Sequence, residues 1–136
     1  MVTRADLIGS WELVSWQGFK NGERIGYPMG EDAQGQVIYS PDGRMSGFLM
    51  RNDFRDAPHG ANPDPNTSLA YGGTFRLEGD EVYHDVMYST IAHWLGHPLI
   101  RTVVPQGDDM ILKTRPETTS SGNVYEHHLF WRRVKG

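Results

Sequence analysis

Apolar and polar residues alternate in short segments along most of this 136-residue chain. A period of two is typical of β-strands, because successive side chains of a strand point to opposite faces of the sheet. Each segment is short and ends at a turn-forming cluster rather than continuing as a helix would. The pattern predicts eight strands, at residues 10–19, 34–39, 45–50, 71–78, 81–89, 99–104, 110–115 and 125–133.

Five turn signals separate these segments and predict tight hairpins. They lie at residues 20–23, 41–43, 78–80, 107–109 and 121–123, and each pairs a Gly with Asn or Asp. Such pairs supply the positive φ angles that tight reversals need, so the strands they join are antiparallel neighbours. We therefore expect an all-β fold, an eight-stranded antiparallel up-and-down barrel. A short helical turn over residues 4–8, with Thr3 as its N-cap, is expected to close one end.

One long segment, residues 51–70, lacks any strand signal. Pro58, Pro63 and Pro65 exclude a ladder of hydrogen bonds there. The composition of residues 64–67 is that of a helix start, so one helical turn is predicted at 65–69. Loops of this length are lids or disordered segments, and the sequence leaves both readings open for a loop that crosses a barrel mouth.

Charged residues indicate which face of each strand lies in water, because an unpaired buried charge costs several kcal/mol. The faces opposite to the charges are therefore predicted to point inward. These inward residues are Phe75, Leu77, Val82, His84, Val86, Tyr88, Met110, Leu112, Thr114, Tyr125, His127, Leu129 and Trp131. Arg101 is left open: it shares a face with Leu99 and Val103, while the opposite face of its strand is equally apolar.

The predicted interior is more polar than a core selected for stability alone, which would favour aliphatic residues and Phe. An eight-stranded barrel has room for a packed core or for one small ligand. Aromatic walls with a few polar groups favour the ligand. The predicted ligand-binding residues are Phe75, Leu77, Val86, Trp94, Arg101, Met110, Leu112, Tyr125, Leu129 and Trp131.

His84 and His127 are the most informative pair of this interior. A neutral imidazole near its working pH can exchange a proton with a bound ligand, with Tyr88 or Tyr125 as a hydrogen-bond donor. The predicted catalytic residues are therefore His84, His127 and Tyr88. The alternative is that a neighbouring hydroxyl or backbone group satisfies each histidine, as is usual for polar core residues.

Composition excludes several classes of function. The chain has no cysteine, which removes disulfides and thiolate metal sites and agrees with a cytoplasmic protein. A net charge of −4 without a long basic run disfavours nucleic acid as a partner. Residues 1–11 hold charges and no long apolar run, so neither a signal peptide nor a membrane anchor is expected.

Cofactor and metal motifs are not found either. The glycines form no phosphate-binding pattern, and no serine nucleophile elbow is present, so we expect no cofactor and no serine triad. His93 and His97 have the four-residue spacing of zinc ligands on a helix. Gly96 and Pro98 make that stretch a loop, where the spacing has no such meaning, so no metal site is predicted.

Five segments of the chain resemble the lipocalin-like domain family. Residues 7–16, LIGSWELVSW, resemble its opening Gly-x-Trp turn and first strand, and residues 35–46 and 71–86 resemble its second hairpin and its middle. Residues 94–101, with Trp-x-Gly and an Arg, and residues 129–133, with Leu-x-Trp-x-Arg, complete the likeness. The resemblance implies one lipocalin-like (calycin) domain over residues 1–136.

The resemblance also implies a structural role for Trp11, which would stack against Arg132 or Arg133 at the closed end of the barrel. Many relatives carry a longer helix where residues 51–71 are rich in proline here. Lipocalin-type barrels include carriers of hydrophobic small molecules and cyclases or isomerases of natural-product pathways, so the fold does not select an activity.

The function expected from these observations is binding of a hydrophobic, aromatic or polyketide-like small molecule in the barrel. The alternative is a cofactor-independent cyclase, isomerase or dehydratase of secondary metabolism that uses His84 or His127 as acid or base. A third reading is an interaction module that forms a homodimer through a sheet face carrying Tyr83 and Met87.

Overall fold

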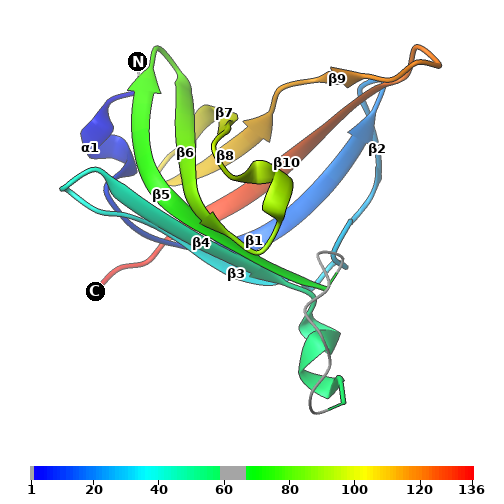
Figure 1. Cartoon of the computed structure of the whole chain (residues 1–136), viewed down its shortest axis with the longest axis horizontal. Helices are drawn as coiled ribbons and strands as arrows, with labels where there is room; N and C mark the ends of the chain where they lie inside the picture. Colours follow the sequence, from blue (N-terminus) through cyan, green and yellow to red (C-terminus); the bar gives the residue numbers. More distant parts are fainter. Residues whose placement is uncertain (1, 59–66) are drawn as a thin grey trace.

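The computed structural model describes residues 2–58 and 67–136 and shows a closed antiparallel β-barrel (Figure 1). Each strand pairs with the next in the order β1-β3-β4-β5-β6-β7-β8-β10, and β10 pairs back with β1. The predicted eight-stranded barrel is confirmed. Its strands are β1 Gly9–Lys20, β3 Gln34–Tyr39, β4 Arg44–Met50, β5 Ser68–Glu78, β6 Glu81–Ser89, β7 Pro98–Gln106, β8 Asp109–Thr114 and β10 Val124–Arg133.

Two short strands that the sequence pattern does not predict extend this sheet. β2, Glu23–Gly26, pairs with the second half of β1, and β9, Glu117–Thr118, pairs with the beginning of β10. Both lie at the upper right of Figure 1, where the long strands β1 and β10 continue beyond their other neighbours. They are too short to show a period, and they form because β1 and β10 leave their edges available there.

All five predicted turns form hairpins. Asn21 and Gly22 have φ angles of 51° and 85° and connect β1 to β2, which is the pattern of a two-residue type I′ turn. Each of the other four turns places one glycine at a positive φ between 62° and 92°. The prediction succeeds because the reversal depends on backbone conformations that these few residues determine locally.

The helical turn α1, Arg4–Leu7, lies against one end of the barrel (Figure 1). The Thr3 N–H donates to Oδ2 of Asp6 at 2.8 Å and so secures the first turn. The Leu7 side chain is fully buried, and its carbonyl accepts the indole N–H of Trp11 at 3.0 Å. The expected closure of one end by a short helix is thus observed.

Arg133 completes the closed end. Its guanidinium lies 4.2 Å above the ring of Trp11 and donates to the carbonyl oxygens of Ile8 at 2.9 Å and Asp6 at 2.6 Å. The partner implied by the family resemblance is therefore Arg133. Arg132 instead points to solvent. The last strand thus holds the first turn of the chain in place.

A β-bulge interrupts the alternation of β6. Gly72 pairs with Tyr88 while Gly73 pairs with Val86, so Met87 has no partner of its own in β5. A Cβ atom on Gly73 would lie 2.0 Å from a main-chain oxygen of β6, a distance that no side chain tolerates. The bulge therefore requires glycine at this position.

The bulge corrects one prediction. Tyr88, predicted to point inward, is 65% exposed on the outside of the barrel, because the extra residue reverses the alternation of side chains after Val86. The prediction assumed an unbroken period of two along 81–89. His84, which precedes the bulge, is 1% exposed.

The connection between β4 and β5 begins with a short 3₁₀ helix, η1 Asn52–Asp56, which projects from the barrel at the lower right of Figure 1. The predicted helical turn at 65–69 is wrong for residues 68 and 69, which begin β5. Residues 59–66 of this loop, which include 65 and 66, lie outside the described residues. Within the described ranges, no helix has the length and apolar character needed to span a bilayer.

Candidate functional site

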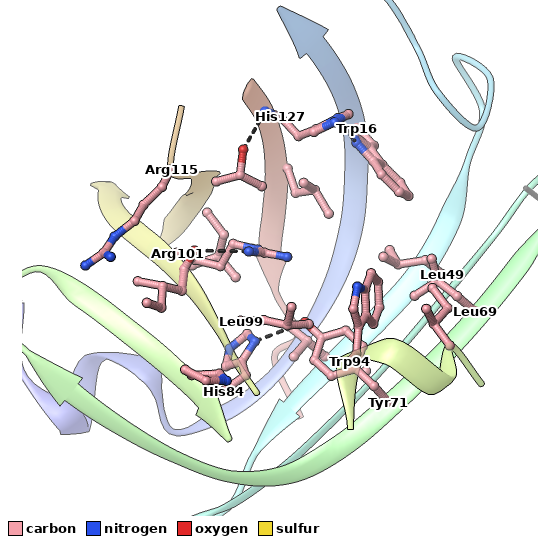
Figure 2. A pocket seen from close by; sticks show the side chains of 18 of the residues that line it. Trp16, Leu49, Leu69, Tyr71, His84, Trp94, Leu99, Arg101, Arg115 and His127 are labelled. Atoms are coloured by element: carbon pink, nitrogen blue, oxygen red, sulfur yellow. Dashed lines mark hydrogen bonds between the residues drawn. The ribbon is translucent and has the colours of Figure 1, made fainter. Parts of the chain in front are cut away.

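The interior of the barrel holds a cavity of about 530 Å³ (Figure 2). This volume lies within the range of about 300–1,000 Å³ that is usual for small-molecule sites. Aromatic and aliphatic side chains form most of its wall. They come from strands around the whole barrel and from the short 3₁₀ helix η2, Ala92–Trp94, and include Trp16, Phe48, Leu49, Leu69, Tyr71, Trp94, Leu99, Leu112, Tyr125, Leu129 and Trp131. The polar and charged residues in contact with it are His84, Arg101, Thr114, Arg115, Glu117 and His127.

Apart from Tyr88, which lies on the outside of the barrel, the predicted site residues divide between the cavity wall and the surrounding core. Those in the wall are His84, His127, Trp94, Arg101, Leu112, Tyr125, Leu129 and Trp131. Phe75, Leu77, Val86 and Met110 do not line the cavity. Phe75 instead packs edge-on against Tyr39, with ring centroids 4.9 Å apart, and lies beneath the guanidinium of Arg4 near the closed end.

Tyr71 and Trp16 are the principal wall residues that sequence reasoning missed. Tyr71 shares a strand face with Phe75, so the period of two would have placed it inside. An unbroken period of two would place Trp16 on the face of Glu12, but a register shift between Leu13 and Ser15 in β1 interrupts that face. No local signal marks such an irregularity.

His84 lies between two tyrosine hydroxyls at the cavity wall. Its Nε2 is 2.6 Å from the hydroxyl oxygen of Tyr39, and its Nδ1 is 3.0 Å from that of Tyr71. Burial, with a smaller contribution from the positive charge of Arg101, lowers the pKa of His84 from 6.5 to about 3. The ring is therefore neutral at physiological pH, with one nitrogen donating and the other accepting.

The direction of these two hydrogen bonds follows from Tyr39. This side chain is 1% exposed, and within the described chain His84 is the hydrogen-bond partner of its hydroxyl. A buried hydroxyl without an acceptor costs about 1–3 kcal/mol, so Tyr39 donates to Nε2 of His84. Nδ1–H then donates to Tyr71, whose own hydroxyl hydrogen is free to point into the cavity. Burial also raises the pKa of Tyr39 and of Tyr71, which keeps both hydroxyls protonated.

The sequence left two alternatives for His84, proton exchange with a ligand or satisfaction by a neighbouring group. The structure shows two hydroxyl partners for His84. Both of its nitrogens are engaged, and its imidazole is held neutral. This chain of three side chains orients the hydroxyl of Tyr71 and leaves His84 little capacity to accept a further proton.

His127 has a different environment. Its Nδ1 accepts the indole N–H of Trp16 at 3.0 Å, which places the ring hydrogen on Nε2. Its main-chain N–H donates to Oγ1 of Thr114 at 2.8 Å. Partial burial, and to a smaller extent the charge of Arg101, lowers the pKa of His127 below its ordinary value. In Figure 2 His127 and His84 lie on opposite sides of Arg101, so they do not form a directly coupled pair.

Arg101 points into the cavity, which resolves the orientation that the sequence left open (Figure 2). Its Nη1 donates to the carbonyl oxygen of Ile100 at 3.0 Å, and no carboxylate of the described residues forms an ion pair with it. Arg115, by contrast, is held by Glu81 through two hydrogen bonds of 2.8 and 2.9 Å. The charge of Arg101 therefore remains available inside the barrel.

The ionisable residues of this site do not form a metal centre. Across residues 2–58 and 67–136, no three His, Asp or Glu side chains lie close enough together to hold a metal ion. His93 lies on the 3₁₀ helix η2, Ala92–Trp94, and His97 in the turn that follows it.

Comparison with known proteins agrees with the architecture. A family model described as a lipocalin-like domain matches residues 8–134, nearly the whole chain. No curated protein and no solved structure gives a significant match. A barrel of this type indicates binding of a small hydrophobic ligand. On the strength of its closed barrel and of this match, the chain belongs to the lipocalin-like domain family.

Proposed function

We propose that this protein binds a hydrophobic, aromatic or polyketide-like small molecule inside its barrel. The observation that carries the proposal is the cavity of about 530 Å³ with six aromatic residues in its wall. Flat aromatic side chains offer large contact areas and favour stacked or edge-on contacts with unsaturated rings. The aromatic wall residues are Trp16, Phe48, Tyr71, Trp94, Tyr125 and Trp131.

A hollow interior supports binding over a purely structural role. Protein cores are packed as densely as organic crystals, and a void forfeits the dispersion contacts of the atoms that line it. The residues of the closed end, such as Leu7, Trp11 and Tyr39, are buried in the hydrophobic core cluster. A ligand would supply the contacts that the atoms lining the cavity lack.

The second candidate function is catalysis without a cofactor, a cyclisation, isomerisation or dehydration of the bound molecule. One observation favours it: the neutral imidazole of His127 and the charge of Arg101 face the same cavity. His127 would accept or return a proton at Nδ1 once the indole N–H of Trp16 gives up its hydrogen bond to that nitrogen, and Arg101 would stabilise an enolate. His84 is less suited to the role because its pKa of about 3 makes it a weak base.

Titration with the neutral dye N-phenyl-naphthylamine, whose fluorescence rises in apolar surroundings, tests the binding proposal. The wild type is expected to give a saturable increase. Leu99→Trp, on the inward face of β7, partly fills the cavity and is expected to weaken binding at least about tenfold, equivalent to about 1.4 kcal/mol. Thr102→Trp, on the outward face of the same strand, is the matched control and should bind as the wild type does.

Absence of a saturable signal in the wild type, or equal affinities in both variants with melting temperatures unchanged, would contradict binding in the barrel. Native mass spectrometry of protein purified from its source organism would identify a ligand that copurifies. Conversion of that compound on incubation, lost in His127→Gln, would support the catalytic candidate, and recovery of the unchanged compound would oppose it.

A further inference from the structure

The polar groups that face the cavity are hydrogen-bond donors. The hydroxyl hydrogen of Tyr71 is free because its oxygen accepts from His84. The ring hydrogen of His127 lies on Nε2, since Nδ1 already accepts. Arg101 adds the N–H groups of its guanidinium that are not bonded to Ile100.

The acceptors of the same wall are already in use or lie at its edge. Oγ1 of Thr114 accepts the main-chain N–H of His127. Glu117 contacts the cavity from the short strand β9, where its side chain is exposed. A ligand that matches this wall therefore brings acceptors rather than donors.

The charge of Arg101 further specifies the chemical groups expected on the ligand. A guanidinium that is half withdrawn from water and has no counter-ion loses solvation without recovering it from a partner. Its positive charge contributes, after burial, to the lowered pKa of both His84 and His127, which lie on opposite sides of it (Figure 2). Neutral imidazoles do not compensate this charge. The missing negative charge is thus expected from the ligand.

We infer that the ligand carries one carboxylate, which binds to Arg101 inside the barrel while its apolar body lies against the aromatic wall. This inference rests on the proposed binding function and adds the chemical class of the ligand. A carboxylate accepts hydrogen bonds through both oxygens and donates none, and guanidinium binds it in a bidentate fashion. A single unpaired cation, with Glu117 at the edge, matches one negative charge better than the two of a phosphate ester.

The test compares naphthoate with naphthamide, which has the same ring and nearly the same shape without the charge. Displacement of the neutral dye by each compound gives both affinities. The wild type is expected to bind naphthoate about 10- to 100-fold more tightly, the range of one charge-assisted pair. Naphthyl phosphate, the third arm, is expected to bind more weakly than naphthoate.

Variants at Arg101 test the assignment to this residue. Arg101→Met should abolish the preference for the acid while the affinity for naphthamide is retained. Arg101→Lys keeps the charge but not the bidentate geometry, so it should retain part of the preference for the acid. This variant also keeps the test valid if Arg101→Met fails to fold. Lys113→Met, which removes a charge from the outward face of β8, is the matched control and should keep the full preference.

Equal or tighter binding of naphthamide to the wild type, with the dye bound normally, would overturn the inference and leave the proposed function standing. A preference that survives Arg101→Met would overturn the role of this residue. Tighter binding of naphthyl phosphate would replace the carboxylate by a phosphate ester. If neither the dye nor any naphthalene binds, the proposed function fails and this inference fails with it.

Discussion

Acidification is expected to destabilise the barrel through His84. The pKa of this ring is about 3 in the folded protein and 6.5 when it is freely solvated. Between these two values the unfolded chain binds the proton and the folded chain does not. Stability therefore falls as the pH drops below about 6.5, and this contribution stops growing below about pH 3.

The size of the effect follows from the shift. Each unit of pKa corresponds to about 1.4 kcal/mol, and pH 5 lies about 1.5 units below the pKa of the unfolded state, so His84 removes about 2 kcal/mol of stability at pH 5. This is a large share of the roughly 5–15 kcal/mol that keeps an ordinary domain folded. Carboxylates contribute mainly at lower pH, and His127 contributes in the same direction but to a smaller extent because its pKa is lowered less.

Urea unfolding of the wild type and of His84→Gln, followed by tryptophan fluorescence at about pH 7.5 and about pH 5, isolates the residue. Glutamine accepts from Tyr39 and donates to Tyr71 as the neutral imidazole does, but it does not titrate. The wild type should lose about 2 kcal/mol more than the variant on acidification, because the other titrating groups are common to both. Equal losses would refute the assignment of a shielded, neutral His84.

Two further predictions concern stability and use paired variants. Gly73→Ala should destabilise the protein by about 3 kcal/mol or more in urea unfolding, because the added Cβ would meet a main-chain oxygen at 2.0 Å. Gly47→Ala is the control: the added Cβ would have nothing nearer than 3.7 Å, so stability should change by less than about 1 kcal/mol. Similar losses in the two variants would contradict the bulge. Arg133→Met should lower stability by about 2 kcal/mol, because it loses the stack on Trp11 and two hydrogen bonds. Arg132→Met removes only an exposed ion pair and should lower stability by less than about 1 kcal/mol. A larger loss in the second variant of that pair would show that the closed end is held differently.

The barrel was predictable because its signals are local. Turn glycines at positive φ, such as Gly43 and Gly79, act within a few residues, and the alternation between turns then gives the strands. Tyr88 was misplaced because the bulge depends on contact between two strands. The adjacent glycines at 72 and 73 are the sequence sign of that irregularity.

The site was less predictable because its partners are distant in sequence. Periodicity placed His84 inside, but nothing local indicates that Tyr39 and Tyr71 would take both of its nitrogens. Arg101 was undecided because the assignment of faces assumed that charges lie in water. Residues that break such a general preference are concentrated at functional sites, where a ligand supplies the missing partner.

The pairing of β1 with β10 also affects how the chain folds while it is being synthesised. Trp11 pairs with Arg133, so the first barrel strand stays without one of its neighbours until the last has been synthesised. At roughly 5–20 residues per second, translation takes on the order of ten seconds to supply that neighbour. During this time the nascent sheet has free edges that can pair with other chains. The protein is therefore most prone to aggregate during translation and in the short time before β10 pairs with β1.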